Sequence, residues 1–130
     1  LMDKMLDPAL PIRRNIANVY DGALEIYLHG ALGPRGCFLI GTATAEAIQH
    51  PRVREVLGQS LRDFDGKIER RIALAIDRGE LPAGGDARIL AKLASAVMHS
   101  LAVRARAGDS EESLRALAAA GVDWICGPEA

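Results

Sequence analysis

One stretch of the chain decides its fold: residues 51–79 read PRVREVLGQSLRDFDGKIERRIALAIDRG. Apolar residues recur there every three or four positions, which is the period of an α-helix with one buried face. The opposite face is charged, and Pro51 and Gly79 stand where a helix begins and ends. The spacing therefore predicts one long amphipathic helix over 51–78, with a buried stripe of Val53, Leu57, Leu61, Phe64, Ile68, Ile72 and Ala75.

The helical period continues on both sides of this stretch. Glycine and proline turns divide the flanking sequence into further helices, which we expect over residues 11–30, 37–49, 87–107 and 110–126. No segment of useful length alternates with the period of a strand. The sequence therefore predicts an all-α fold, a single orthogonal bundle of about five to six helices. We expect one domain over residues 1–130, in which residues 1–9 form the tail of a linker helix.

Particular residue types mark the ends of these helices. Gly30 suits a left-handed C-terminal cap, and glycine also follows the long helix at Gly79. Asp86 suits the N-cap of the helix that follows it, because its side chain accepts hydrogen bonds from free backbone N–H groups. Either Asp109 or Ser110 suits the N-cap of the last helix.

The composition excludes several classes of protein. The 130 residues are 49% hydrophobic and 25% charged, with a formal net charge of −1. These values exclude a strongly basic nucleic-acid-binding domain, and we interpret the arginines of the long helix, Arg70 and Arg71 among them, as a solvated, salt-bridged face. Two cysteines, Cys37 and Cys126, are too few for a disulfide framework. No apolar stretch approaches the ~20 residues that cross a membrane, so we expect a cytoplasmic protein without a membrane partner.

The last two predicted helices carry more apolar surface than one core contact requires. Small residues let helices approach closely, so we expect these helices and their symmetry mates to form the four-helix interface of a homodimer. The alternative is that the excess apolar surface packs inside the monomer. The small residues on or beside the two stripes are Ala94, Ala102, Ala105, Ala118 and Gly121.

A second group of residues has the composition of a small-molecule pocket. Tyrosine and threonine hydroxyls stand inside otherwise apolar stripes, and such pockets are typically apolar with a few polar groups. Hydrogen bonds to backbone carbonyls one turn earlier would satisfy the same hydroxyls, so the composition leaves both interpretations open. From stripe position and residue type, the candidate ligand-binding residues are Ile16, Tyr20, Tyr27, Phe38, Thr42, Phe64, Ile68 and Met98.

No arrangement of catalytic or metal-binding residues stands out. The three histidines lie on separate segments, and Glu46 and His50, four residues apart, are two ligands and not a metal site. A small helical enzyme is the weakest hypothesis, because its acid–base groups would have to come from Glu46, His50, Asp65 and His99. We therefore expect no enzyme activity, no metal and no cofactor.

Several short motifs resemble, in their order, one known family. The run RGCFLI over residues 35–40 is followed by Ala43, by Ala45-Glu46 and by HPRV over residues 50–53. Further on, RGELP over residues 78–82 is followed by Asp86, Leu90-Ala91 and Leu93, then by LAVRARAG over residues 101–108 and Leu114. Over about residues 12–126 this pattern is similar to the C-terminal part of TetR-type transcriptional repressors.

The resemblance implies a regulatory domain. In that family the domain binds a small effector, here expected to be mostly apolar, and dimerises through its last two long helices. It controls an N-terminal helix-turn-helix domain, which has no counterpart in these residues and would take about 50–70 residues upstream. We therefore expect a cytoplasmic bacterial repressor that contacts operator DNA only through that domain, or alternatively a ligand-independent dimerisation module. The residues expected at the dimer interface are Ala94, Leu101, Ala105, Leu114, Leu117, Ala118, Gly121, Val122 and Ile125.

Overall fold

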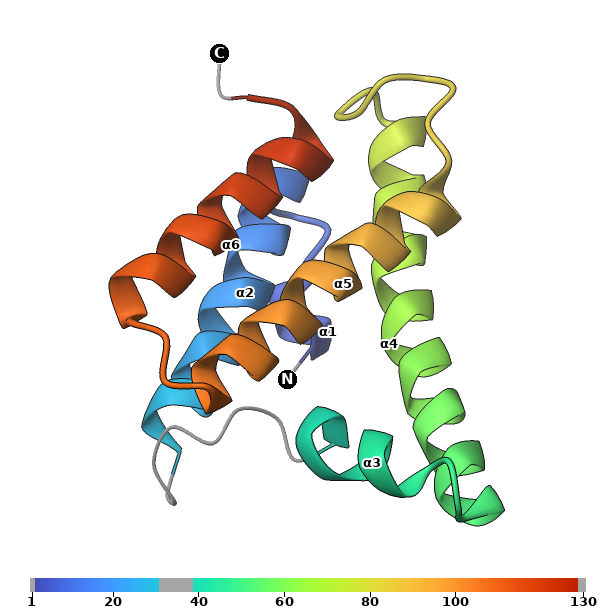
Figure 1. The fold of residues 1–130 in the computed structure, drawn as a ribbon. Helices are drawn as coiled ribbons and strands as arrows, with labels where there is room; N and C mark the ends of the chain where they lie inside the picture. Colours follow the sequence, from blue (N-terminus) through green and yellow to red (C-terminus); the bar gives the residue numbers. More distant parts are fainter. Residues whose placement is uncertain (1, 31–38, 129–130) are drawn as a thin grey trace.

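The computed structural model describes residues 2–30 and 39–128, and every regular element in this part of the chain is helical (Figure 1). The predicted all-α fold is therefore confirmed. A π-helical turn, η1, leads directly into the short helix α3. The elements are α1 (Met2–Met5), α2 (Ile12–His29), η1 (Leu39–Ala43), α3 (Thr44–Glu46), α4 (Pro51–Asp77), α5 (Ala87–Arg106) and α6 (Glu111–Cys126).

The predicted helix bounds agree with the structure except in one segment. The helix expected over residues 37–49 is broken into η1 and α3, and a turn follows over residues 47–49. Residues 37 and 38 lie outside the described part of the chain. The other four predicted helices begin and end within one or two residues of α2, α4, α5 and α6.

Helix α5 is the centre of the bundle. It packs against α4 on one side and against α6 and α2 on the other, as Figure 1 shows. The core between them contains fully buried side chains from each helix, such as Leu24, Ile72, Leu101 and Leu114. Each of these side chains contributes about 1.5–3 kcal/mol through burial, so packing rather than helix propensity holds the bundle together.

The apolar stripe of α4 is covered along only half of its length. Ile68, Ile72 and Ala75 are at most 1% exposed. The N-terminal half of the same stripe is half-buried from Val53 to Phe64, and this end of α4 lies beside α3 (Figure 1). The stripe therefore leaves apolar surface uncovered where α4 meets η1 and α3.

Most of the predicted helix caps are confirmed. Asp86 accepts hydrogen bonds from the N–H groups of Arg88 and Ile89 at 3.0 and 3.3 Å, and Ser110 accepts one from Ser113 at 3.1 Å. The left-handed cap expected at Gly30 is wrong, because this residue is extended, with φ −64° and ψ 163°. A methyl carbon there would lie 2.8 Å from the carbonyl oxygen of Ile26, and this close approach explains the glycine.

The interpretation of Arg71 as a solvated residue is also wrong. Its side chain is 3% exposed, and its Nε donates to Asn15 Oδ1 at 2.6 Å. The same guanidinium bonds to the Glu80 carboxylate at 3.2 Å and to the Leu10 carbonyl oxygen at 2.9 Å. Asn15 Nδ2 in turn donates to the carbonyl oxygens of Met5 and Asp7, at 3.1 and 2.9 Å. The network therefore joins the N-terminal segment to α2, α4 and the loop after α4.

Candidate functional site

Most of the predicted ligand-binding residues lie in the core of the domain or pack against it. Five of them belong to the buried core, three on α2 and one each on α4 and α5: Ile16, Tyr20, Tyr27, Ile68 and Met98. Phe64 on α4 is half-buried and packs against that core, and Thr42 in η1 is half-buried. Phe38 lies outside the described residues. The region between α2, α4, α5 and η1 is therefore the candidate effector site.

The hydroxyl of Tyr20 is already used in the protein. It donates to the carbonyl oxygen of Ala94 on α5 at 2.9 Å. Burial, and to a smaller extent the charge of Cys126, raises the pKa of Tyr20 well above its usual value. The tyrosine therefore stays uncharged and fixes α2 against α5, so its hydroxyl proton is not free to bind a ligand.

Two buried polar atoms on α5 have no hydrogen-bond partner among the described residues. They are the Oγ of Ser95 and the Nδ1 of His99, both on α5. Burial lowers the pKa of His99, and Asp65 on α4 opposes this effect by attracting the charged ring. Sequence reasoning missed Ser95, although its position four residues before His99 in an apolar stripe was visible.

The candidate acid–base residues do not assemble into one group. His50 Nε2 and Glu46 Oε2 are 3.2 Å apart, and both side chains are more than half exposed. Asp65 and His99 belong instead to α4 and α5. Among the described residues, no three or more His, Cys, Asp or Glu side chains are placed to hold a metal ion.

Most residues expected at the dimer interface lie inside the protomer. The buried apolar residues of α5 and α6 form a stripe on each helix, which we call the inward stripe, and both helices pack against α2. Leu117 is the exception among the expected interface residues, because its exposure is intermediate. Gly121 lets α6 approach closely, since a methyl carbon there would lie 2.9 Å from Val97 and 3.2 Å from Tyr20. The residues already buried within the single chain are Ala94, Leu101, Ala105, Leu114, Ala118, Gly121, Val122 and Ile125.

A different set of apolar residues faces outward on the same two helices. Ile89, Leu93 and Val103 on α5 are 47%, 52% and 55% exposed, and Trp124 on α6 is 87% exposed. Their spacing places the three residues of α5 on one face, and Leu117 and Trp124 on one face of α6. We call these five residues the outer face. The sequence-based list missed its exposed members, which neighbour the inward stripe in the sequence.

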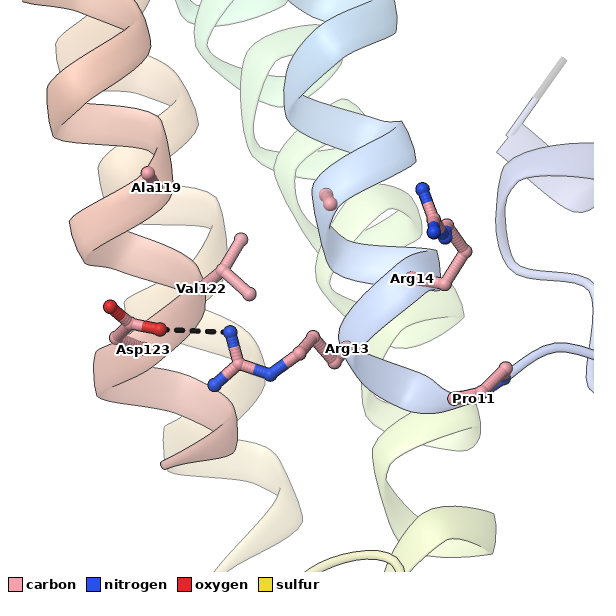
Figure 2. Close-up of a pocket in the computed structure, with 7 residues that line it drawn as sticks. Pro11, Arg13, Arg14, Ala119, Val122 and Asp123 are labelled. Carbon is pink, nitrogen blue, oxygen red and sulfur yellow. Dashed lines mark hydrogen bonds and ion pairs between the residues drawn. The ribbon is translucent and has the colours of Figure 1, made fainter. Parts of the chain in front are cut away.

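A surface cavity of about 500 Å³ lies between the N-terminal end of α2 and the C-terminal half of α6 (Figure 2). The guanidinium of Arg13 crosses it to Asp123, with 2.8 Å between Nη1 and Oδ1. The cavity contains none of the predicted ligand-binding residues. Its lining is Pro11, Arg13, Arg14, Ala17, Ala119, Val122 and Asp123.

None of the described helices is both long enough and apolar enough to pass through a lipid bilayer.

No curated protein and no solved structure matches the chain. A family model does match, and its description is "Tetracyclin repressor-like, C-terminal domain". The match runs over residues 13–120, which is most of the chain and includes most of the core, the candidate effector site and most of α6. The chain therefore belongs to the TetR-like C-terminal domain family, and it is a regulatory domain of a TetR-family regulator.

Proposed function

We propose that this domain dimerises through the outer face of α5 and α6 and binds a small, mostly apolar effector between α2, α4, α5 and η1. Effector binding would then change the affinity of a helix-turn-helix domain, outside this chain, for operator DNA. The proposal keeps the two helices that the sequence indicated for dimerisation. It replaces most of the predicted contact residues by their exposed neighbours.

The observation that supports dimerisation is the exposure of the outer face. Four large apolar side chains, Ile89, Leu93, Val103 and Trp124, are each more than 45% exposed on two adjacent helices. Large apolar side chains that gather on one surface mark an interaction site, and on this basis we propose the outer face as the interface. Two such helix pairs related by a two-fold axis would form a four-helix bundle and cover it.

The observation that supports effector binding is the half-covered stripe of α4. Leu57, Leu61 and Phe64 retain exposed apolar surface, whereas Ile68 and Ile72 in the same stripe are buried. Two polar atoms without partners among the described residues lie on α5, and one of them belongs to His99, on which Asp65 of α4 acts electrostatically. An apolar lining with a few polar groups is the usual composition of a small-molecule site.

Effector binding acts on DNA binding only if the effector has different affinities for two arrangements of the domain. A 100-fold change in operator affinity requires a coupling free energy of about 2.7 kcal/mol. The α4 helix contributes to the candidate site at Phe64 and holds the N-terminal segment through Arg71. It is therefore the element through which we propose that the coupling runs.

Light scattering after size-exclusion chromatography tests the dimer. Leu93→Glu places a carboxylate in the centre of the outer face, and we expect this variant to elute as a monomer because the charge would be buried without a partner. The matched control is Val56→Glu, because Val56 is also apolar and is 58% exposed, but it lies on α4, outside the outer face. It should remain a dimer. A dimeric Leu93→Glu protein would place the interface elsewhere.

A ligand-independent dimerisation module remains the second candidate. Ile16, Tyr20 and Ile68 are each 1% exposed, so the protein itself already fills this part of the candidate site. The two functions differ in one measurement, which is saturable binding of a small amphiphile to the purified domain.

A further inference from the structure

Two polar side chains on one face of α5 have buried atoms without a partner. Ser95 is 3% exposed, and its Oγ forms no hydrogen bond within the part of the chain that the structure describes. The same is true of the Nδ1 of His99, whose ring is partly buried. Because the residues are four apart, their side chains are neighbours on one helical face.

Local structure does not account for this pair. A serine inside a helix commonly bonds to the carbonyl oxygen one turn earlier, and Ser95 does not. Elsewhere in this core, polar groups are satisfied, as the bond from Tyr20 to the Ala94 carbonyl oxygen shows. Buried polar groups in native proteins nearly always have a partner in the protein, in water or in a ligand. The pair therefore has free hydrogen-bonding capacity next to the candidate effector site.

The surroundings select the kind of group that fits. The serine hydroxyl is uncharged, and burial lowers the pKa of His99, which favours the neutral form of its ring. An anion at this position would meet the carboxylate of Asp65, which acts on His99 from α4. A cation would lose its hydration in exchange for two neutral partners. An uncharged group that donates or accepts hydrogen bonds meets neither cost.

We propose that the effector carries an uncharged hydrogen-bonding group, such as a hydroxyl or an amide, on an apolar body, and that Ser95 Oγ and His99 Nδ1 bind this group. The inference rests on the proposed effector-binding function and names the ligand class for the same site. A ligand hydroxyl suits the pair because it donates to one atom and accepts from the other, and a neutral imidazole nitrogen and a serine hydroxyl allow either arrangement.

Three eight-carbon probes with a neutral, an anionic and a cationic head group test the proposal: 1-octanol, octanoate and octylammonium. Binding to the ¹⁵N-labelled chain is followed by NMR titration, below the aqueous solubility limit of 1-octanol and below the micelle concentrations of the two charged probes. We expect 1-octanol to bind at least about tenfold more tightly than either charged probe. Ser95→Ala and His99→Phe should each weaken 1-octanol binding by about tenfold, the effect of losing one hydrogen bond, and should leave the charged probes unchanged.

The matched control is Ser100→Ala. Ser100 follows His99, but its hydroxyl accepts a hydrogen bond from Arg104 Nε at 3.0 Å on the exposed side of α5. This variant should bind 1-octanol as the unmodified chain does. If 1-octanol binds all variants equally, or if a charged probe binds best, the inference is overturned and effector binding stands. If none of the three probes binds saturably to the unmodified chain, both proposals fall.

Thermal unfolding separates a ligand-binding role of Ser95 from a structural one. Removing an unpaired buried hydroxyl leaves no partner unsatisfied, so the unfolding midpoint of Ser95→Ala should equal or exceed that of the unmodified chain. A midpoint lowered by several degrees would show that the hydroxyl stabilises the fold, and would overturn the assignment.

Discussion

Replacing Arg71 by methionine tests the network that holds the N-terminal segment. The Arg71 side chain is 3% exposed and donates to Asn15, Leu10 and Glu80 at 2.6–3.2 Å. Methionine has similar volume but no donor, so Asn15 Oδ1 and the Leu10 carbonyl oxygen would lose a donor, whereas Glu80 is partly solvated and keeps the hydrogen bond from the Ile12 N–H. A buried acceptor left without a donor costs about 1–3 kcal/mol. We expect Arg71→Met to lower the free energy of unfolding by about 3 kcal/mol, a large part of the ~5–15 kcal/mol typical of a domain.

Urea denaturation followed by far-ultraviolet circular dichroism measures this loss. The matched control is Arg70→Met, because Arg70 is the preceding residue of α4 and is exposed. Its free energy of unfolding should change by no more than about 0.5 kcal/mol. If the two variants differ by less than about 1 kcal/mol, the buried pair does not hold the segment, and the reasoning from burial and hydrogen bonds is refuted.

The same pair predicts a pH dependence. Partial burial alone would raise the pKa of Glu80, but the hydrogen bonds from Arg71 and from the Ile12 N–H outweigh it, so the pKa lies below its usual 4.5. A lowered pKa in the folded state contributes stability above pH 4.5 that is lost as the pH falls through the folded value. The stability difference between the unmodified chain and Arg71→Met should therefore narrow in acid, and a constant difference down to pH 2 would contradict this.

Two further predictions concern packing and thiol chemistry. Gly121→Ala should destabilise the fold by about 1–3 kcal/mol, because the added methyl carbon would lie 2.9 Å from Val97. The control is Gly66→Ala on α4, where the nearest atom to the added methyl carbon is at 3.4 Å. This control should stabilise the fold by up to ~1 kcal/mol. Equal thermal shifts for the two would show that the close helix contact is absent. Burial raises the pKa of Cys126 to about 11, so iodoacetamide should alkylate it slowly at pH 8 and faster above pH 10, with the other cysteine replaced by alanine. Fast labelling at pH 8 would contradict this burial.

The sequence predicted a helix end correctly where a single residue produces it, either through its own side chain or through its backbone conformation. Asp86 and Ser110 bond to backbone N–H groups within three residues, and Gly79 has φ +77°, which other residues rarely adopt. Gly30 was misinterpreted because its cause is different. The carbonyl oxygen of Ile26 approaches it closely, and residue type alone does not distinguish this contact from a positive φ.

The spacing of apolar residues predicts which apolar side chains are buried only where a helix has a single apolar face, and it does not predict the burial of a charged residue. Arg71 lies three residues after Ile68 and four before Ala75, so its position matches the buried stripe although its charge indicated solvent. The partners that make this burial possible, Asn15 and Glu80, come from other segments of the chain. On α5, apolar residues occupy adjacent faces, so periodicity alone does not decide which of them packs against α2 and which stays exposed. The structure decides this by burying the stripe that fits against Tyr20 and Gly121.

Buried polar groups in this core fall into two kinds with opposite effects on stability. Tyr20 and Arg71 have partners on neighbouring elements, so removing either side chain would leave acceptors unsatisfied. Ser95 and His99 each have an atom without a partner among the described residues, at a cost of about 1–3 kcal/mol per group. A ligand that bonds to both recovers part of this cost, and a hydrocarbon of the same shape does not. The selectivity that we propose for a neutral polar effector therefore rests on these two groups, which have no partner among the described residues.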